Sequence, residues 1–499
     1  MQIFLYLCTE ICENCKMIAQ NDIKNFFFLG IGGIGMSALA RYFHHEGYPV
    51  SGYDRTPSAL TKELEDEGIK VCFRDAQDML KGLGLSANHT LVIRTPAVPE
   101  DSVLYSYFRA EGYSIIKRAE VLGLVTKQKK ALCVAGTHGK TTTSTMLAHL
   151  LNKGQGDVVQ CTKEERTKGV NAFLGGISMN YGTNLLLDKE SEYVVVEADE
   201  YDRSFHHLKP YISVVTAVDA DHLDIYGSAE AYRESFAHYT SLITHALVMK
   251  HGIELQPRLQ PGVKCYTYGV VENQQTAISK DSYPSFYADH IRIEDGQIYF
   301  DFHTPDSVIA DMQLGVPVWV NIENAVAALA VAWLVQTDEE QLKDRLASFK
   351  GVLRRFNIHV NTAKVAYIDD YAHHPQEIAT SIDSIRKLFP ERKLIGVFQP
   401  HLYTRTRDFA DGFASVLSTL DEVVLLPIYP AREEPIEGVN SEMLMSLITN
   451  PHKTIVQKPE LTEFLQKRVA QANEPVVILT VGAGDIDRLV PEITEKLKG

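Results

Sequence analysis

Short apolar runs recur along this chain, and most of them are followed by a turn and then by an amphipathic stretch. Such runs lie at 26–29, 132–135, 193–199 and 212–218. Apolar runs of this length that end at turn residues are typical of buried strands. Strands that alternate with helical stretches predict a mainly parallel sheet, and we therefore expect an α/β fold.

The alternation divides the chain into several parts. We expect an N-terminal extension at 1–21, a first α/β domain at 22–128, a second at 129–350 and a third at 351–499. About three domains is also what the length of 499 residues predicts.

The second domain contains three segments of different character. The polar stretch at 152–176 is predicted to be an irregular surface excursion. The segment at 263–318 alternates polar and apolar residues and is predicted to be β-rich, and the alanine-rich stretch at 321–335 is predicted to be a buried helix.

Charge and cysteine content narrow the class of protein. With 64 acidic and 49 basic residues the net charge is −15, which disfavours nucleic-acid and membrane-surface binding. Seven cysteines are sparse for a chain of 499 residues and indicate reduced thiols, not a framework of disulfides. No apolar run reaches the ~18 residues that a membrane helix needs. We expect a cytoplasmic protein, monomeric or weakly homo-oligomeric, without nucleic-acid or membrane partners.

Three of the cysteines, Cys8, Cys12 and Cys15, form a C-x3-C-x2-C motif. Radical enzymes use this spacing to hold an iron–sulfur cluster, but thiolate spacing alone fixes no cluster. Because a glycine loop of a different fold follows shortly afterwards, we favour a nonspecific extension.

The first glycine loop has the form G-x-G-x-x-G, with Gly30, Gly32 and Gly35. An apolar run precedes it, an amphipathic stretch follows it, and Asp54 lies 19 residues after Gly35. This context favours a diphosphate bound at a helix N-terminus. A glycine turn that only permits close helix packing is the alternative. The residues assigned to this site are Gly30, Gly32, Gly33, Ile34, Gly35, Met36 and Asp54.

A second glycine loop, "GTHGKTTT", departs from the common phosphate loop. The pattern G-x-x-x-x-G-K-[ST] would require a glycine at Val134, and the glycine stands at Gly136 instead. A strand, two glycines and a helix nevertheless predict a phosphate site in which Lys140 reaches the β/γ-phosphates and Thr141 binds Mg²⁺. An ordinary turn with a surface lysine is the alternative. The loop residues assigned to ATP are Gly136, Thr137, His138, Gly139, Lys140, Thr141 and Thr142.

Acidic residues and a histidine follow the next two predicted strands. Glu197 follows the β-branched residues of the run at 193–199, at the end of the predicted strand, and His222 lies in a polar turn after the run at 212–218. Ligands of α/β folds bind at the carboxyl ends of strands, so both residues are candidates for Mg²⁺ or phosphate. A solvated acidic turn and a structural histidine are the alternatives.

The third domain carries its candidate residues after two predicted strands and in an arginine pair. Arg355 could neutralise a transferring phosphate, and Asp370 could hold a ribose or orient a cation. His401 and Arg405 follow "GVFQP", where an arginine suits carboxylate recognition. Solvated charged turns are the alternative.

Taken together, these motifs resemble the Mur ligase family, and within it the branch that adds L-alanine. The resemblance covers nearly all of the chain from about residue 22, through "LGIGGIGMSALA", "AGTHGKTTT", "VEADEYDRSF", "DADHLDIYG", "NIENAVAALA", "LRRFN", "DDYAHHPQEI", "FQPHLYTRTRDF" and "VGAGDI". It implies an N-terminal Rossmann-like domain for the UDP-sugar, a central P-loop ATPase domain with a mostly parallel sheet, and a C-terminal Rossmann-like domain.

The resemblance also implies an ADP-forming amide ligation, by way of an acyl phosphate, with ATP and Mg²⁺ as cofactors and UDP-N-acetylmuramate and L-alanine as partners. It implies that Glu197 and His222 serve a second magnesium ion and that Lys140, Arg355 and Arg405 are catalytic. It assigns the adenine to Asn321 and Asn324, the ribose to Asp370, and the acceptor site to Tyr371, His401 and Arg405.

Two departures from the family pattern change these expectations. No lysine lies between His222 and Met249, so the carbamylated lysine that several relatives use as a magnesium ligand is expected to be absent. Leu402 stands where some relatives carry an arginine, so Arg405 is expected to carry more of the carboxylate recognition.

Three other functions remain as alternatives. A nicotinamide-dependent dehydrogenase would use the first glycine loop but leaves "GTHGKTTT" without a role. A recycling ligase that adds a preformed peptide would share "EADEYD" and "DDYAHHP", whereas "HLYTRTRDF" favours the alanine-adding branch. A non-catalytic nucleotide-binding protein is disfavoured because the phosphate, magnesium and acceptor motifs are all intact.

Overall fold

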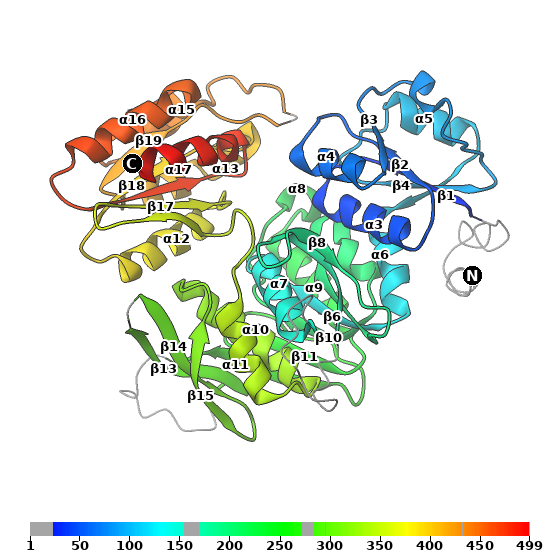
Figure 1. Ribbon diagram of the computed structural model, residues 1–499, viewed down its shortest axis with the longest axis horizontal. Coiled ribbons are helices and arrows are strands. Elements are labelled where there is room, and N and C mark those ends of the chain that lie inside the picture. The colour runs from blue at the N-terminus through cyan, green and yellow to red at the C-terminus, as the bar shows by residue number, and fades with distance from the viewer. Residues whose placement is uncertain (1–22, 154–168, 272–282, 295, 432, 499) are drawn as a thin grey trace. The chain divides into compact units, whose positions relative to one another are not determined.

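The computed structural model describes residues 23–153, 169–271, 283–294, 296–431 and 433–498 (Figure 1). The motif of Cys8, Cys12 and Cys15 lies outside these residues. The described residues form three sheets with helices around them, and most of the neighbouring strands in these sheets are parallel. The predicted α/β class with three mainly parallel domains is confirmed, while the exact domain boundaries stay a prediction.

The first sheet has the strand order β3-β2-β1-β4-β5, and all of its neighbouring strands are parallel. This order is that of a Rossmann half, in which the strand order reverses between β1 and β4. Its elements are β1 (Asn25–Leu29), α3 (Ile34–His45), β2 (Val50–Tyr53), α4 (Ala59–Asp66), β3 (Lys70–Cys72), η1 (Gln77–Leu80), β4 (Thr90–Arg94), α5 (Val103–Ala110), β5 (Ser114–Lys117) and α6 (Arg118–Lys127).

Strand β1 shows why this sheet is covered on both faces. Phe26 and Phe28 pack in one apolar cluster with α3, whereas Phe27 and Leu29 pack in another with α5. Successive side chains of a strand point to opposite faces, so an unbroken apolar run requires helices on both sides. Figure 1 shows α3 and α5 on opposite sides of the sheet.

The second sheet has ten strands in the order β15-β14-β13-β12-β11-β10-β6-β9-β7-β8. Its elements are β6 (Lys130–Ala135), α7 (Lys140–Leu151), β7 (Asn171–Ser178), β8 (Thr183–Leu186), β9 (Tyr193–Ala198), η2 (Tyr201–His207), β10 (Pro210–Val215), α8 (Leu223–Tyr226), α9 (Ala229–Thr240), β11 (Ala246–Lys250), β12 (Lys264–Val270), β13 (Phe286–Glu294), β14 (Gln297–His303), β15 (Val308–Leu314), α10 (Trp319–Leu334) and α11 (Glu339–Ser348). The predicted β-rich segment and buried helix are confirmed.

One prediction for this domain is wrong in part, and residues 154–168 of the stretch it concerns lie outside the described residues. The stretch 152–176 was expected to be a surface excursion, but its last six residues, 171–176, lie in β7, which pairs with β9 and β8. The buried side chains of Ala172, Phe173 and Leu174 explain the difference, because these three apolar residues fit a sheet interior. The polar residues before them and the glycine pair after them concealed the strand in the sequence.

The third sheet has the order β16-β17-β21-β18-β19-β20, with β16 antiparallel at one edge. Its elements are β16 (Asn357–Asn361), β17 (Val365–Asp370), α12 (Pro375–Leu388), β18 (Lys393–Phe398), α13 (Tyr403–Asp408), α14 (Ala410–Leu417), β19 (Glu422–Leu425), α15 (Ser441–Leu447), β20 (Lys453–Ile455), α16 (Lys458–Gln471), β21 (Val476–Val481), η4 (Asp485–Leu489) and α17 (Val490–Lys498).

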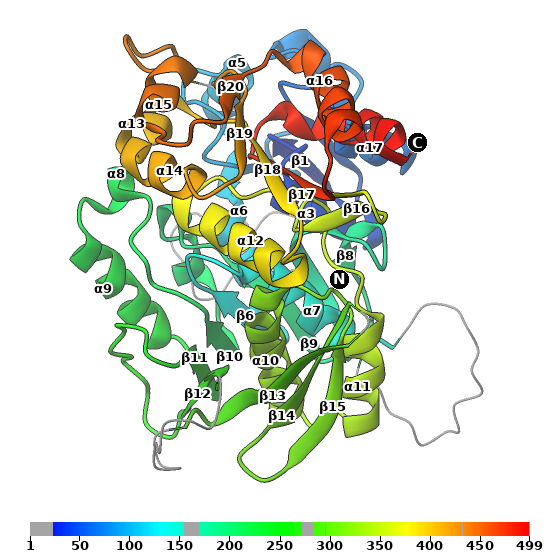
Figure 2. The same ribbon diagram turned by 90° about the vertical axis from the view of Figure 1, so that its left-hand side faces the viewer.

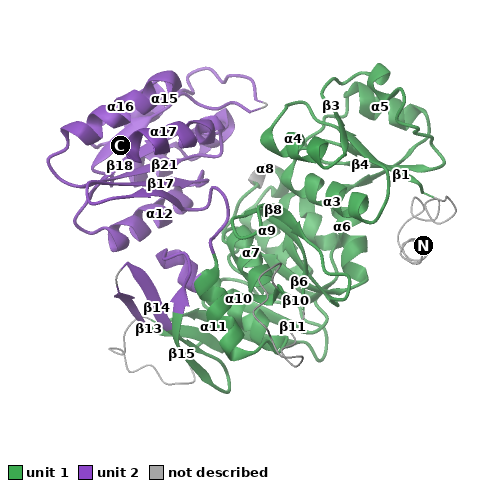
Figure 3. Ribbon diagram, in the orientation of Figure 1, with its two compact units in different colours: residues 1–290, 301–312, 324–349 green, residues 291–300, 313–323, 350–499 purple. Residues whose placement is uncertain are grey.

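The chain divides into two compact units, which Figure 3 shows in different colours. The first unit comprises residues 1–290, 301–312 and 324–349, and the second comprises 291–300, 313–323 and 350–499. Among the described residues, no helix combines the length and the apolar character needed to cross a membrane.

Candidate functional site

The first glycine loop joins β1 to α3 and is held by the end of β2. Gly30 has a φ of +87°, a left-handed conformation that favours glycine, and its N–H donates to the Tyr53 carbonyl at 2.7 Å. The Gly32 N–H donates to Asp54 Oδ2 at 2.8 Å. Asp54 therefore fixes the shape of the loop, in addition to its predicted role in UDP-sugar binding.

Helix α3 begins with an uncapped end. Gly33 is its N-cap residue, and no side-chain hydrogen bond caps the helix, while Ile34, Gly35 and Met36 form the first turn. The first N–H groups of a helix lack partners within the helix and attract anions. The structure thus brings the seven residues predicted for the UDP-sugar to one loop and helix end.

The second glycine loop joins β6 to α7 and is closed by the end of β10. Gly136 has a φ of +133°, and a Cβ there would lie 2.1 Å from Thr216 Oγ1. The Thr216 hydroxyl also donates to the His138 carbonyl. Thr137 Oγ1 donates to the Asp219 carbonyl at 2.7 Å. Strand β10 and the turn after it therefore shape the shortened loop that the sequence showed.

Lys140 lies at the start of α7, between the loop and the turn after β9, with 13% of its side chain exposed. Its Nζ donates to the Gly136 carbonyl at 2.6 Å and lies 2.8 Å from Glu200 Oε2. Burial alone would lower the pKa of Lys140, but the carboxylates of Glu200 and Glu197 outweigh it and leave the pKa raised. The lysine is therefore held as a cation where phosphate is predicted to bind.

Glu200 is the carboxylate that completes this ion pair, and sequence reasoning gave it no role of its own. Only 2% of it is exposed, and burial raises its pKa to about 7 against the opposing effect of Lys140. The acidic residues after β9 were visible in the sequence, but which of them faces the lysine depends on the turn at Asp199, whose Oδ1 accepts the Tyr201 N–H at 3.1 Å.

Glu197 lies near the end of β9 with an unsatisfied oxygen. Its Oε2 is buried and has no hydrogen-bond partner within the described part of the chain, and a Cβ on Gly175 would lie 1.9 Å from it. A buried carboxylate oxygen without a partner is costly unless a cation satisfies it. The site therefore fits Mg²⁺, which prefers carboxylate oxygens beside phosphate oxygens.

His222 lies in the turn after β10 in a left-handed conformation, with a φ of +53°. Its N–H donates to Asp221 Oδ1 at 2.7 Å, and its ring meets the Tyr201 ring edge-on at 5.1 Å. Tyr201 follows Glu200 directly, so the turn after β10 contacts the acidic turn after β9. Shared magnesium binding by Glu197 and His222 remains a prediction.

Asn324 lies on α10 and reaches the second glycine loop. Its Oδ1 accepts from Thr143 Oγ1 at 3.2 Å, and a Cβ on Gly139 would lie 2.8 Å from that oxygen. Asn321 lies one turn earlier on the same helix and is also buried. Helix α7 also packs against α11, beside which it lies in Figure 2. Adenine binding by the two asparagines remains a prediction.

In the second unit, the arginine pair packs on an aromatic ring. The guanidinium carbons of Arg354 and Arg355 lie 4.9 Å and 5.0 Å from the centre of the Tyr371 ring. The Tyr371 N–H donates to the Arg354 carbonyl at 2.8 Å. Cations over an aromatic face are attracted by its quadrupole, so the ring fixes the position of Arg355.

Asp370 ends β17 and is buried, with both carboxylate oxygens engaged. Oδ1 accepts the Phe356 N–H at 3.3 Å, and Oδ2 accepts from the Ser381 hydroxyl. Burial raises the pKa of Asp370. The carboxylate therefore anchors the turn that carries Arg355, and its predicted ribose contact would be made from this position.

The predicted acceptor residues form a series of contacts in this unit. Arg405 Nη1 lies 3.5 Å from His401 Nδ1, and the His401 ring lies 6.2 Å from that of His373. His373 in turn contacts the Tyr371 ring edge-on at 5.3 Å. Burial lowers the pKa of His373. Sequence reasoning missed this histidine, although "DDYAHHP" places it three residues after Asp370.

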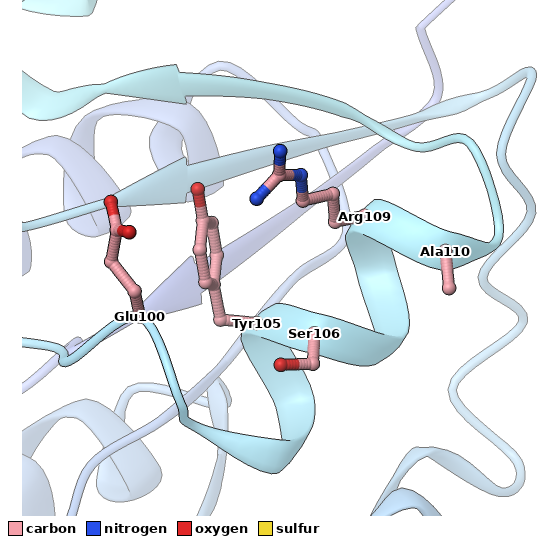
Figure 4. A pocket seen from close by; sticks show the side chains of 5 residues that line it. All are labelled: Glu100, Tyr105, Ser106, Arg109 and Ala110. Atoms are coloured by element: carbon pink, nitrogen blue, oxygen red, sulfur yellow. The ribbon is translucent and has the colours of Figure 1, made fainter.

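Two further features contain none of the predicted site residues. A hollow of about 390 Å³ beside α5 is lined by Glu100, Tyr105, Ser106, Arg109 and Ala110 (Figure 4). Asp289, His290 and Asp301 form a group on β13 and β14 whose ligand atoms lie within 4.8 Å of one another. This group is partly exposed, and its ion pairs and hydrogen bonds account for its geometry.

Comparison with known proteins agrees with this arrangement. The family models described as "Mur ligase family, catalytic domain", "Mur ligase middle domain" and "Mur ligase, glutamate ligase domain" match residues 25–130, 134–332 and 354–484. The UDP-N-acetylmuramate–L-alanine ligase of Parabacteroides distasonis is 53% identical over 479 residues, which are 96% of this chain and 98% of that protein. The enzyme of the same name from Flavobacterium johnsoniae is 45% identical over 96% of this chain and 98% of its own.

Solved structures show the same relationship. The UDP-N-acetylmuramate–alanine ligase of Thermotoga maritima has a TM-score of 0.75 and 27% identity, covering 95% of this chain and 99% of its own. A murein peptide ligase from Psychrobacter arcticus shares the fold, with a TM-score of 0.67 at 19% identity over 95% of this chain and 98% of its own. The three matching domains and the 53% identity over nearly the whole length show that this chain belongs to the Mur ligase family.

Proposed function

We propose that this chain ligates L-alanine to the lactyl carboxylate of UDP-N-acetylmuramate, with conversion of ATP to ADP and phosphate, in the cytoplasmic synthesis of peptidoglycan precursors. The relatives that share about half of its residues over nearly their full length carry this activity in their names. The observation that carries the proposal is Lys140 at the glycine loop, paired with Glu200, together with the unsatisfied Oε2 of Glu197 at the end of the neighbouring strand.

The chemistry requires activation of a carboxylate. A carboxylate is a poor electrophile because its leaving group would be oxide, so the γ-phosphoryl group of ATP is first transferred to it. The amine of L-alanine attacks the resulting acyl phosphate, and the tetrahedral intermediate collapses with loss of phosphate. The protein contributes positioning and charge neutralisation.

In the first unit, Lys140 would bridge the β- and γ-phosphates from the start of α7. Thr141, Glu197 and His222 would hold Mg²⁺, which neutralises phosphate charge and polarises the acyl oxygen when bound. The other loop residues would bind phosphate through their N–H groups, and Asn324 would approach the nucleotide from α10.

In the second unit, Arg355 would stabilise the transferring phosphoryl group from its place on the Tyr371 ring. Asp370 would serve the ribose of ATP. Tyr371, His401 and Arg405 would line the acceptor site, where the guanidinium of Arg405 recognises the carboxylate of L-alanine.

Phosphate release tests the proposal directly. The protein is incubated with UDP-N-acetylmuramate, ATP and Mg²⁺, and single amino acids or a tripeptide are added. We expect release with L-alanine and none without the UDP-sugar. Release only with the tripeptide would instead identify a recycling ligase, and tight NAD binding without ATP turnover would identify a dehydrogenase.

A variant separates the two nucleotide sites. Lys140→Ala is expected to reduce turnover by at least about 10³-fold, because it removes the cation that faces the transferring phosphate. Binding of UDP-N-acetylmuramate, measured by calorimetry, should stay within about twofold, since its loop lies on the first sheet. Equal loss of turnover and of UDP-sugar binding would contradict the separate assignment of the two loops.

A further inference from the structure

Arg118 is a residue that the site assignments above leave without a role. It begins α6 directly after β5, in the first domain, and its side chain is 21% exposed. Its Nη2 donates to Asp199 Oδ2 at 2.8 Å. Because Asp199 follows β9, this ion pair joins the first domain to the strand end that carries Glu197.

The other half of the Arg118 guanidinium faces the first glycine loop. A Cβ added to Gly35 would lie 2.5 Å from Arg118 Nη1 and 3.3 Å from its Cζ. Gly35 lies in the first turn of α3 and has no positive φ, so its backbone conformation does not require glycine. The third glycine of the motif therefore makes room for an arginine at the helix end.

This placement suits a group that must contact two acceptors. A diphosphate bound at the N-terminus of α3 needs a compensating cation, because the chain carries a net charge of −15 and Asp54 adds a carboxylate to the same loop. A guanidinium can donate to two acceptors in different directions through its planar fork, whereas an ammonium acts as a point charge.

We propose that Arg118 binds the diphosphate of the UDP-sugar through Nη1 while Nη2 stays on Asp199, so that it positions the sugar relative to the ATP-binding strand end. The identity of the ligand rests on the proposed function, whereas the placement of the arginine does not. In this arrangement the lactyl carboxylate is brought toward the turn that follows Glu197.

The neighbouring pair provides a matched control. Lys117 Nζ lies 2.7 Å from Asp202 Oδ2. Like the pair of Arg118 and Asp199, this ion pair joins the end of β5 to the acidic turn after β9. The side chain of Lys117 is 43% exposed, and no glycine of the first loop has Lys117 among the nearest neighbours of an added Cβ. Lys117→Gln therefore removes a parallel ion pair without touching the proposed diphosphate contact.

Binding is tested by calorimetric titration of the full chain with UDP and with UDP-N-acetylmuramate, without ATP. Arg118→Gln is expected to weaken both ligands by about 10- to 100-fold, as for loss of a hydrogen bond to a charged group. Lys117→Gln should stay within twofold, and Arg118→Lys should lie between the two. Unchanged binding in Arg118→Gln, or equal weakening in both glutamine variants, would overturn the proposal.

A double-mutant cycle tests whether Gly35 acts through the arginine. Gly35→Ala displaces the flexible end of Arg118 and should weaken UDP binding in the wild-type background. In the Arg118→Gln background the same change should have an effect below twofold. Additive effects would mean that Gly35 and Arg118 act independently, which contradicts the proposal.

Kinetics distinguishes positioning from a purely structural role. Arg118→Gln should raise KM for the UDP-sugar at least tenfold and leave KM for ATP within twofold. A general loss of structure would raise both KM values and lower the melting temperature. If the wild-type protein releases no phosphate with L-alanine, the proposed function fails, and the UDP titrations still decide the role of Arg118.

Discussion

Buried carboxylates differ mainly in what compensates their charge. Glu200 has Lys140 as a partner at 2.8 Å, whereas Glu197 Oε2 has none within the described residues. Asp369 is 1% exposed and accepts a hydrogen bond from the neutral Thr480 Oγ1 at 3.0 Å, while Arg354 attracts its charge without an ion pair within the described residues. A cation or a hydrogen bond reduces the cost of burying a carboxylate, and a carboxylate that lacks full compensation is retained at the expense of stability.

Asp369 gives a pH-dependent prediction. Burial raises its pKa to about 6, against the lowering effects of Arg354 and Thr480. The folded state therefore holds this proton more tightly than the unfolded chain, and stability is lost as pH rises from about 4 to about 6. Asp369→Asn keeps the side chain neutral and should stabilise the third sheet at pH 7.5, by on the order of 1–2 kcal/mol.

The measurement is the melting temperature of the full chain at pH 5 and at pH 7.5. We expect Asp369→Asn to melt several degrees higher than wild type at pH 7.5 and about half as far above it at pH 5, which is midway through the range in which the stability is lost. Asp383→Asn, which removes an exposed partner of Lys387, should shift the melting temperature by less than about 1 °C at either pH. An equal shift at both pH values would show that ionisation of Asp369 is not the cause.

At the same scale, the sequence predicted the residues within each motif but not the pairs between motifs. Lys140 was placed in a phosphate loop because glycines, lysine and threonine follow one another in the chain. Its pairing with Glu200 and the contact of Asn324 with Thr143 span 60 and 181 residues. Such pairs depend on strand order and turn geometry, which local patterns do not specify.

At the scale of elements, strands and helices with clear periodicity were predictable, and those that tertiary contacts stabilise were not. Strands β1, β6 and β9 are each apolar except for one polar or charged residue. Strand β7 contains two glycines and follows a polar stretch, so only its pairing with β9 and β8 identifies it. The antiparallel edge strand β16 was not predicted either. Its buried and exposed residues do not alternate regularly, so it lacks the period of two that indicates a strand.

The junction of β6 and α7 gives an element-scale prediction. Gly136 combines a φ of +133° with a close approach to β10, where a Cβ would lie 2.1 Å from Thr216 Oγ1 and 2.8 Å from the Ala217 nitrogen. Gly136→Ala must therefore move the loop away from β10. We expect ATP binding to weaken at least 100-fold and the melting temperature to fall, because both strain and a backbone clash oppose the native loop.

Gly182→Ala is the matched control for that loop. Gly182 also has a positive φ, +65°, but nothing lies within 4 Å of an added Cβ. It should cost only about 1 kcal/mol from backbone strain and leave ATP affinity within twofold. Calorimetric ATP titration and thermal melting of both variants check this, and equal loss of affinity would show that the approach to β10 is not decisive.

At the scale of the whole molecule, the first unit joins two sheets through a buried polar connection. Arg41 on α3 is 8% exposed, contacts Glu63 and Glu67, and donates from Nη1 to Asn184 Oδ1 at 2.6 Å. Asn184, on β8 of the second sheet, is fully buried and donates from Nδ2 to the Ile34 carbonyl at 2.6 Å. The end of α3 that is predicted to bind diphosphate is thus fixed by the ATP-binding domain.

Asn184→Ala should weaken the attachment of the whole first domain to the second sheet. The change removes the amide acceptor of Arg41 Nη1, a loss of roughly 1–3 kcal/mol for a buried polar group. It also removes one donor to the Ile34 carbonyl, which keeps the Ser37 hydroxyl at 2.9 Å. Hydrogen exchange should accelerate across β1 to β5 and less across the β6, β9 and β10 strands, and KM for the UDP-sugar should rise more than KM for ATP. Arg74→Gln, which removes an exposed pair with Asp78, should change neither. Faster exchange spread evenly over both sheets would show that the first unit opens as one cooperative body, and that Asn184 contributes general stability without specifically holding the diphosphate-binding end of α3.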